Sequence, residues 1–243
     1  MKILKEHLFG DLYIRHIEGA TATTTDSLLL AAFLPMALGR AAELGAGGGI
    51  VSLLAARRGR FTGADLYERN ETLAALCERN IRENRLTDRL SVYNADVRTL
   101  GEPRRYLSVY ANPPYRRAGE GKGSGNPLLD IARFERSGTL ADFCLAAARI
   151  LLPEGSLSLV LPTKRLADAE AGLRAAGLFL AERVTVYPYP GGTPKLLLLR
   201  AALREEKPTD SRFTLAREKG GAPTEEACAL YEEGILIRRG DTE

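Results

Sequence analysis

The stretch that decides the fold of this 243-residue chain is AAELGAGGGIVSLLAA, residues 41–56. A short, mostly apolar segment comes first, glycines follow at alternate positions, Gly45, Gly47 and Gly49, and an apolar run ends the stretch. Glycine tolerates positive φ, so this repetition predicts a tight turn whose backbone passes close beneath a ligand. The helix that follows offers free N–H groups at its start. We therefore expect a strand, a glycine loop and a helix.

The glycine spacing restricts the ligand. A dinucleotide fingerprint reads Gly-x-Gly-x-x-Gly, whereas this loop reads Gly-x-Gly-x-Gly, and Glu43 precedes the first glycine by two residues. A carboxylate at that place suits the cationic amino group of a methionine-like ligand better than it suits a pyrophosphate. The spacing therefore disfavours NAD. The candidate cofactor-binding residues of the loop are Glu43, Gly45, Ala46 and Gly47.

A second strand is expected over FTGADL, residues 61–66, with Asp65 at its carboxyl end. An acid at that end can accept hydrogen bonds from ribose hydroxyls, by the logic of doubly wound nucleotide folds. Asp65 and its neighbour Leu66 are therefore candidate cofactor contacts, and Glu68 is the alternative acid.

A third strand is expected over SVYNADV, residues 91–97. Asp96, near its end, either contacts the adenine amino group of a cofactor or caps a turn, because Asp commonly does the latter. Asp96 and Val97 are therefore also candidate cofactor contacts.

The fourth apolar run, YLSVY at residues 106–110, leads to Asn112, Pro113, Pro114 and Tyr115. Proline fixes its own φ and pushes the preceding residue toward extended backbone. The Asn112 amide oxygen and the Pro113 carbonyl are thus expected to form two acceptors aimed at one incoming group, beside the flat ring of Tyr115. Such acceptors suit an aromatic amine, because they stabilise the charge that develops as its nitrogen attacks. Pro-Pro after a strand also marks ordinary turns, so this interpretation depends on the glycine loop.

Two flanking segments have alternative interpretations. The cluster Thr23, Thr24, Thr25 and Asp26 precedes an apolar helix from Ser27 and either caps it only or caps it and also faces the ligand, with Thr25 and Asp26 as candidate cofactor contacts. The basic, glycine-rich segment 116–126 is either a substrate loop or a solvated loop without a partner.

The bulk composition suits one intracellular α/β domain. Of the residues, 45% are hydrophobic and 27% charged, and the net charge of +3 neither requires nor excludes a polyanionic partner. The three cysteines, Cys77, Cys144 and Cys228, are far apart and odd in number, so we expect reduced thiols. The two histidines have no metal-ligand spacing, and we expect no metal site.

No membrane segment or signal peptide is expected. Charged residues interrupt the N-terminus early, and the apolar run 28–38 is about half the roughly 20 residues that span a bilayer. A cytoplasmic protein is therefore expected.

The remaining chain is expected to complete the fold. Residues 1–20 alternate as a strand or hairpin, and 178–187 with 195–201 form a final antiparallel pair. From Arg204 the composition turns charged, which predicts a weakly ordered extension with a hairpin near 231–237.

Four elements in one order carry a family resemblance: ELGAGGG at 43–49, Asp65, Asp96, and NPPY at 112–115. The series resembles that of Rossmann-like S-adenosylmethionine-dependent amino-methyltransferases. The flanks TDSLLLAAF at 25–33, IARFE at 131–135 and GTLAD at 138–142 are similar to the bacterial tRNA(Val) adenine-N6-methyltransferase family. The similarity covers about residues 10–202. Phe134 stands where family members usually carry His, and the segment from Arg204 matches poorly.

The resemblance implies an α/β fold with a Rossmann-like seven-stranded sheet, mostly parallel with the last strand antiparallel, and helices on both faces. It divides the chain into an N-terminal extension (1–20), a methyltransferase domain (21–202) and a C-terminal extension (203–243). The implied cofactor is S-adenosylmethionine and the implied substrate is RNA, with tRNA favoured and no obligate protein partner. The implied catalytic residues are Asn112, Pro113, Pro114 and Tyr115. Asn112 also joins the cofactor set, and the expected substrate contacts are Tyr115, Arg116, Arg117 and Arg133, with further phosphate contacts from Arg104, Arg105, Lys164 and Arg165.

Other substrates suit the same loop. A protein-glutamine methyltransferase would present a side-chain amide to it, but such enzymes usually carry a distinct helical domain before the first helix, and only some 25 residues precede it here. Ribosomal RNA guanine-N2 and DNA adenine methylation use related loops. A catalytically silent RNA-binding module of the same fold is the alternative from another class.

Overall fold

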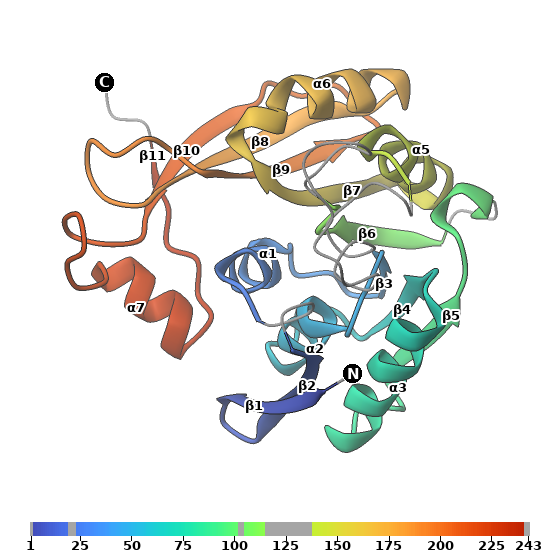
Figure 1. Cartoon of the computed structure of the whole chain (residues 1–243). Helices are drawn as coiled ribbons and strands as arrows, with labels where there is room; N and C mark the ends of the chain where they lie inside the picture. The colour runs from blue at the N-terminus through green and yellow to red at the C-terminus, as the bar shows by residue number, and fades with distance from the viewer. Residues whose placement is uncertain (1, 19–22, 102–104, 115–137, 241–243) are drawn as a thin grey trace.

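The computed structural model describes residues 2–18, 23–101, 105–114 and 138–240 of the chain (Figure 1). The strands are β1 (Ile3–Phe9), β2 (Leu12–Ile17), β3 (Arg40–Leu44), β4 (Gly63–Glu68), β5 (Leu90–Asn94), β6 (Tyr106–Ala111), β7 (Leu151–Pro162), β8 (Phe179–Tyr187), β9 (Leu196–Ala202), β10 (Thr209–Thr214) and β11 (Arg239–Gly240). The helices are α1 (Thr25–Phe33), α2 (Ile50–Arg57), α3 (Glu71–Glu83), α5 (Leu140–Ile150), α6 (Leu166–Ala175) and α7 (Glu225–Glu232), with the 3-10 turns η1 (Val97–Thr99) and η3 (Thr163–Arg165).

A mixed sheet is the centre of the molecule. Within the described residues its strand order is β11-β10-β8-β9-β7-β6-β3-β4-β5. The strands β5, β4, β3, β6 and β7 are parallel, and β9 runs antiparallel to both β7 and β8. The expected mostly parallel sheet with the antiparallel strand β9 is therefore confirmed, and in the described residues β10 and β11 extend the expected seven strands to nine. Its winding reverses between β3 and β6, which is where open α/β sheets bind ligands.

Helices cover both faces of this sheet (Figure 1). One core cluster joins the apolar sides of α1, α2 and α7 to one face, and the other joins α5 and α6 to the opposite face. The strands β3 and β6 have buried residues on both faces, which is typical of parallel strands enclosed by helices.

Local capping explains where several helices begin. Thr24 accepts a hydrogen bond from the Ser27 N–H before α1, and Asn70 accepts one from the Leu73 N–H before α3. Thr139 and Asp142 form a reciprocal capping box at the start of α5. These caps satisfy N–H groups that have no partner within the helix.

The N-terminal segment forms the expected hairpin, in which β1 pairs antiparallel with β2. Leu12 and Ile14 turn into the main core, while Ile17 packs with Leu73 and Leu76 of α3. The hairpin therefore lies against the helical layer and is not part of the main sheet (Figure 1).

The C-terminal segment differs from its expectation. The strand β10 pairs in parallel with β8, so residues 209–214 continue the main sheet. The hairpin expected near 231–237 is wrong, because α7 extends to Glu232 and the residues after it form no strand before β11. Thr224 caps this helix, and Ala227 and Leu230, three residues apart, are buried on one side of it. The domain division at residue 202 stays a prediction.

Three expectations about composition concern the described residues. Cys77 and Cys144 are buried free thiols and Cys228 is a partly buried one, as expected of reduced cysteines. In the described part of the chain, no helix is both long and apolar enough to cross a membrane. The same residues contain no group of three or more His, Cys, Asp or Glu side chains suited to a metal ion.

Candidate functional site

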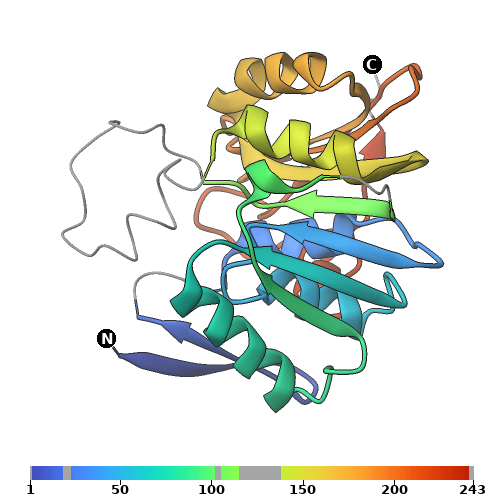
Figure 2. The ribbon, with the colours of Figure 1, turned by 90° about the vertical axis from the view of Figure 1, so that its right-hand side faces the viewer.

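The candidate site lies along the carboxyl edge of four neighbouring parallel strands, β6, β3, β4 and β5. Parallel strands bring the loops that follow them to one edge, which is at the left in Figure 2. Asn112 follows β6, the glycine loop follows β3, Glu68 ends β4, and Asp96 follows β5. Tertiary structure therefore brings four segments, spread over about 70 residues of sequence, into one row.

The glycine loop has the backbone that its composition predicts. The φ angles of Gly45, Gly47 and Gly49 are 71°, 55° and 80°, in the left-handed region that favours glycine. A Cβ at Gly49 would lie 2.5 Å from the Cys77 sulfur, whereas one at Gly47 would meet nothing within 4 Å. The loop thus packs tightly where it enters α2 and has open space at Gly47, where a ligand can approach the backbone.

Hydrogen bonds to β4 hold the loop. The N–H groups of Gly45 and Ala46 donate to the Tyr67 carbonyl, at 2.8 and 3.1 Å. The Gly47 N–H donates to the Glu68 carboxylate at 2.8 Å, and the other oxygen of that carboxylate accepts the Asn70 N–H at 2.7 Å. Glu68 therefore links the glycine loop to the start of α3.

Glu68, not Asp65, is the acid at the carboxyl end of β4. The expectation for Asp65 is wrong in position, because the strand begins at Gly63 and ends at Glu68, about two residues later than the sequence suggested. Burial raises the pKa of Glu68, although the N–H groups of Asn70 and Gly47 favour its charged form. The N–H groups of Gly47, Asn70 and Arg69 donate to its two oxygens, and a carboxylate has about four acceptor positions, so it has capacity for a further donor such as a ribose hydroxyl.

Asp65 and Leu66 are interior residues of the strand. The Asp65 carboxylate is ion-paired with Arg40 and accepts a hydrogen bond from the Tyr106 hydroxyl at 2.8 Å. Leu66 is fully buried in the hydrophobic core. Both side chains are therefore used inside the protein, and their expected contact with a cofactor has no support in this arrangement.

Glu43 lies beneath the glycine loop, on the side of the sheet that faces α2. Its side chain is buried, and the Ser52 hydroxyl donates to it. The Tyr110 hydroxyl lies 2.6 Å from that of Ser52, so the three polar groups form one buried cluster. Burial raises the pKa of Glu43 to about 8, which makes the acid neutral at lower pH. Its predicted contact with a cationic amino group stays a prediction.

Asp96 caps a turn. It accepts the Arg98 N–H at 3.0 Å at the start of η1, and its carboxylate also pairs with the side chains of Arg98 and Arg69. The hydrogen bond from the Arg98 side chain lowers the pKa of Asp96 to about 2. Val97 is buried. The capping interpretation is thus confirmed, and a contact with adenine stays a prediction.

The first turn of α1 points toward the same carboxyl edge. The Leu34 carbonyl, just after this helix, accepts a hydrogen bond at 3.1 Å from Arg60, which precedes β4 at the opposite edge. The cap before α1 is Thr24, and both Thr25 and Asp26 are half-buried. The helix therefore has the cap that was expected, and its orientation is compatible with Thr25 and Asp26 facing a ligand.

Asn112, Pro113 and Pro114 follow β6 directly. Pro113 is buried, while Asn112 and Pro114 are partly exposed. The other expected contacts of this loop, Tyr115, Arg116, Arg117 and Arg133, lie outside the described residues.

The expected phosphate contacts separate in space. Lys164 is exposed just after β7, at the carboxyl edge beside β6. Arg105 precedes β6 and so lies at the opposite edge, where its N–H donates to the Ile150 carbonyl. Arg165 is buried and paired with Asp168 at 2.6 Å. The expectations for Arg105 and Arg165 are therefore not supported, and Arg104 lies outside the described residues.

Sequence reasoning missed one neighbour of the site, the turn at residues 188–195 between β8 and β9. Because Leu196 at the start of β9 pairs with Pro162 at the end of β7, this turn lies at the carboxyl edge. The Thr163 N–H donates to the Lys195 carbonyl at 3.0 Å and holds it there. Tyr189 and the exposed Lys195 are therefore near the site edge. The predicted antiparallel pair could have located this turn, because a strand antiparallel to β7 must begin beside the carboxyl end of β7.

Comparisons with known proteins agree with this arrangement. Residues 21–175 match the model of the family described as methyltransferase small domain. The chain is 30% identical over 234 residues to a tRNA1(Val) (adenine(37)-N6)-methyltransferase of Tolumonas auensis, covering 94% of this chain and 95% of the relative. A protein of the same description from Bacteroides thetaiotaomicron is 25% identical over 201 residues, covering 82% of this chain and 84% of the relative.

Solved structures show the same fold. A protein of Agrobacterium tumefaciens described as a predicted O-methyltransferase superposes with a TM-score of 0.68 at 23% identity, covering 88% of this chain and 98% of that chain. TYW2 of P. horikoshii, solved in complex with MeSAdo, superposes with a TM-score of 0.58 at 16% identity, covering 83% of this chain and 72% of that chain.

Proposed function

Because the chain belongs to the methyltransferase small domain family, whose members use S-adenosylmethionine, we propose that it methylates the exocyclic N6 amine of adenine in RNA, with tRNA near the anticodon as the favoured substrate. The relatives described above, named as adenine-N6-methyltransferases of tRNA1(Val), align over most of the chain. The reaction class and the cofactor are those of the family, and the choice of substrate is our proposal.

The observation that carries this proposal is the register between β3 and β6. Leu44 pairs with Ala111, so the next residues of the two strands, Gly45 and Asn112, begin their loops side by side. Neighbouring strands are about 4.8 Å apart. The loop that suits an amine therefore starts one strand spacing from the glycine loop, which favours direct transfer between two groups held in place.

The residues of the edge fit S-adenosylmethionine. Open space at Gly47 allows a ligand to approach the loop backbone, and the Glu68 carboxylate retains acceptor capacity for ribose hydroxyls. Glu43, beneath the loop, is the acid that we assign to the amino group of the methionine moiety. When bound, the cofactor supplies an electrophilic methyl group on a sulfonium centre.

Asn112 and Pro113 have the acceptors needed on the amine side. The Asn112 amide oxygen and the Pro113 carbonyl each accept one N–H of the target amine, which aligns its nitrogen with the methyl carbon. The nitrogen–carbon bond forms as the carbon–sulfur bond breaks, and one proton then leaves the nitrogen for solvent. Oriented dipoles stabilise the positive charge that develops on the nitrogen, so no strong base is needed.

The target base must leave its stack to reach Asn112, because the amine of a stacked or paired base is not accessible to acceptors at the edge of the sheet. We assign the stacking platform to Tyr115 and phosphate contacts to Arg116, Arg117 and Arg133, which lie outside the described residues. Lys164, exposed beside β6, is a further phosphate contact at this edge.

The test is to incubate the purified protein with methyl-labelled S-adenosylmethionine and total bacterial tRNA, digest the RNA and identify the labelled nucleoside by mass. We expect N6-methyladenosine from a single tRNA species. The same reaction on tRNA that already carries the modification is the control and should incorporate no label.

Other outcomes would overturn the substrate assignment and identify its replacement. The incubation is repeated with ribosomal RNA, DNA and protein in place of tRNA. Label as N2-methylguanosine, N6-methyladenine or methylglutamine, respectively, without label in tRNA, would replace tRNA adenine as the substrate. Absence of any transfer together with absence of S-adenosylmethionine binding would contradict an enzymatic role and favour an RNA-binding module.

A further inference from the structure

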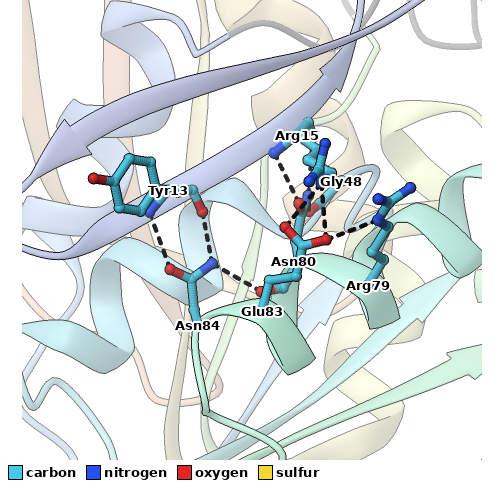
Figure 3. A network of polar contacts seen from close by, with 7 residues as sticks. All are labelled: Tyr13, Arg15, Gly48, Arg79, Asn80, Glu83 and Asn84. Atoms are coloured by element: carbon cyan, nitrogen blue, oxygen red, sulfur yellow. Dashed lines mark hydrogen bonds and ion pairs between the residues drawn. The ribbon is translucent and has the colours of Figure 1, made fainter.

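Two asparagines one turn apart, Asn80 on α3 and Asn84 at the C-terminal cap of that helix, bind the backbone of β2 in the same way (Figure 3). The Asn84 amide oxygen accepts the Tyr13 N–H at 3.0 Å, and its nitrogen donates to the Tyr13 carbonyl at 2.6 Å. The Asn80 amide oxygen accepts the Arg15 N–H at 2.8 Å, and its nitrogen donates to the Arg15 carbonyl at 3.0 Å. Each side chain therefore satisfies both backbone groups of one residue of the hairpin.

Matching repeats of helix and strand explain this pairing. Residues four apart on a helix lie on one face, about 6 Å apart along the axis. Alternate residues of a strand are about 6.7 Å apart and direct their N–H and C=O groups to the same edge. The residues between them, such as Ile14 and His16, direct theirs to β1. The asparagine pair thus takes the place of a neighbouring strand along the free edge of β2.

The two asparagines differ in their remaining N–H group. Asn84 donates it to the Asn80 carbonyl at 2.8 Å, within α3 itself. Asn80 donates it to the carbonyl of Gly48 in the glycine loop, at 2.9 Å. Asn80 is fully buried, so both its donors and its acceptor are used inside the protein. Asn80 therefore connects the hairpin to the glycine loop, whereas Asn84 connects the hairpin only to α3.

The Asn80 bond to the Gly48 carbonyl holds the glycine loop from the side opposite β4, which the loop's hydrogen bonds to β4 do not do. The Gly45, Ala46 and Gly47 N–H groups all donate toward β4, on one side of the loop. Gly48 lies between two glycines with positive φ, where the backbone has few steric limits. The Gly49 N–H of its peptide unit donates to the Ala46 carbonyl at 2.8 Å within the loop, and the other polar group of that unit, the Gly48 carbonyl, points to α3. Asn80 holds that carbonyl from the opposite side, next to the open space at Gly47.

The ion pairs around this network do not explain the connection. Glu83 pairs with Arg15 at 2.8 Å and with Arg79 at 2.9 Å, but these side chains are 25–43% exposed and such pairs stabilise little. The link to the loop runs through the neutral, buried amide.

We propose that Asn80 is a positioning residue for cofactor binding, through which the N-terminal hairpin holds the glycine loop in the conformation that accepts S-adenosylmethionine. Asn80 acts through Gly48 and does not contact the reacting atoms. The proposal concerns the cofactor side of the site only, so it is independent of which amine is methylated.

The experiment compares Asn80→Asp with Asn84→Asp. Each substitution keeps the acceptor for the β2 N–H group and removes two donated hydrogen bonds, one of them to a β2 carbonyl. Only Asn80→Asp loses the bond to Gly48. We expect similar decreases in melting temperature, but an increase of about tenfold in the Kd for S-adenosylhomocysteine only in Asn80→Asp, as suits one lost buried hydrogen bond. Calorimetric titration measures this Kd, and the increase should appear in the KM for S-adenosylmethionine rather than in kcat.

Equal changes of Kd in the two variants, or an unchanged Kd in Asn80→Asp, would contradict the proposal. Should Asn80→Asp fail to fold, hydrogen exchange on the wild-type protein decides, because coupling between two sites is reciprocal. Saturating S-adenosylhomocysteine is then expected to slow exchange of the Arg15 amide more than that of the Tyr13 amide. Protection of the glycine loop with no effect on Arg15 would overturn the role of Asn80.

Discussion

The strand β4 carries two buried acids, Glu68 at the carboxyl edge of the central sheet and Asp65 toward its amino edge, and the protein binds them in different ways. At the carboxyl edge, the backbone N–H groups of Gly47 and Asn70 donate to Glu68. Toward the amino edge, on the opposite face of the strand, Asp65 pairs with the Arg40 side chain and accepts the Tyr106 hydroxyl.

The difference indicates that Asp65 contributes to the stability of the fold and Glu68 to ligand binding. The charge of Asp65 is neutralised by Arg40 inside the protein, so the pair is complete without a ligand. Glu68 is instead held by backbone N–H groups, including those of Gly47 and Asn70, which fix the glycine loop and the start of α3. These bonds leave the carboxylate able to accept from a group that binds at the edge. We therefore expect substitutions at the amino edge to change the free energy of unfolding, and substitutions at the carboxyl edge to change binding and turnover.

The largest effect is expected for Asn112→Ala. Loss of the amide acceptor removes a dipole that stabilises the transition state, so methyl transfer should fall about 100- to 1000-fold. The Kd for S-adenosylhomocysteine should stay within about twofold, because the glycine loop is unchanged. Label incorporation measures the first quantity and calorimetry the second. Arg105→Ala, at the amino end of the same strand, is the matched control, and equal losses in both variants would refute the distinction between the edges.

Glu43 is a third buried acid, and the Ser52 hydroxyl donates a hydrogen bond to it. Its pKa of about 8 in the folded protein exceeds the usual 4.5, so wild-type stability should fall as pH rises from about 4.5 to 8, where the unfolded chain ionises first. Glu43→Gln has no proton to lose and should gain relative stability over this range, by up to about 4 kcal/mol at pH 8. Urea unfolding at pH 5 and pH 8 measures it. A constant difference between wild type and variant would show that Glu43 is ionised throughout.

Asp65→Asn tests the amino edge. The substitution leaves Arg40 without its carboxylate, and since Arg40 is partly exposed we expect a loss of about 2 kcal/mol in the free energy of unfolding. The Kd for S-adenosylhomocysteine should not change. Urea denaturation and calorimetry provide the two readouts. A large increase in this Kd would show that Asp65 contributes to cofactor binding.

Glu68→Gln, in contrast to Asp65→Asn, should weaken cofactor binding and should cause the smallest change in stability. A neutral amide keeps one acceptor but turns a donor toward one of the two backbone N–H groups, so both loops loosen. We expect an increase of about tenfold in the Kd for S-adenosylhomocysteine and a stability loss of about 1 kcal/mol. If Glu68→Gln lowers stability more than Asp65→Asn does, the separation between the edges fails.

Sequence reasoning identified the parts of the site that local chemistry determines. The glycine spacing predicted the turn after β3, and Pro113 and Pro114 predicted the loop after β6. The capping residue Thr24 follows the same rule, since its side chain accepts from an N–H group three residues away. Such features need only their neighbours in the chain, so they can be read without the fold.

The position of the acid on β4 could not be read in this way. A parallel strand covered on both faces is buried at consecutive residues, so it lacks the alternation that marks where a strand ends. Asp65 and Glu68 both followed apolar residues, and only pairing with β3 and β5 decided which of them reaches the edge. The strand β10 was missed for a related reason, because its exposed, polar residues become a strand only by pairing with β8.

By itself, the sequence determined the glycine loop, the Asn-Pro-Pro loop and the kind of element at most positions, because turns, caps and apolar faces depend on neighbouring residues. Tertiary structure alone decided that Gly45 and Asn112 begin adjacent loops, that Glu68 faces the site, and that Asn80 joins β2 to Gly48. These relations connect residues 21 to 67 positions apart in the chain. They depend on strand order and register, which are set when the whole hydrophobic core forms.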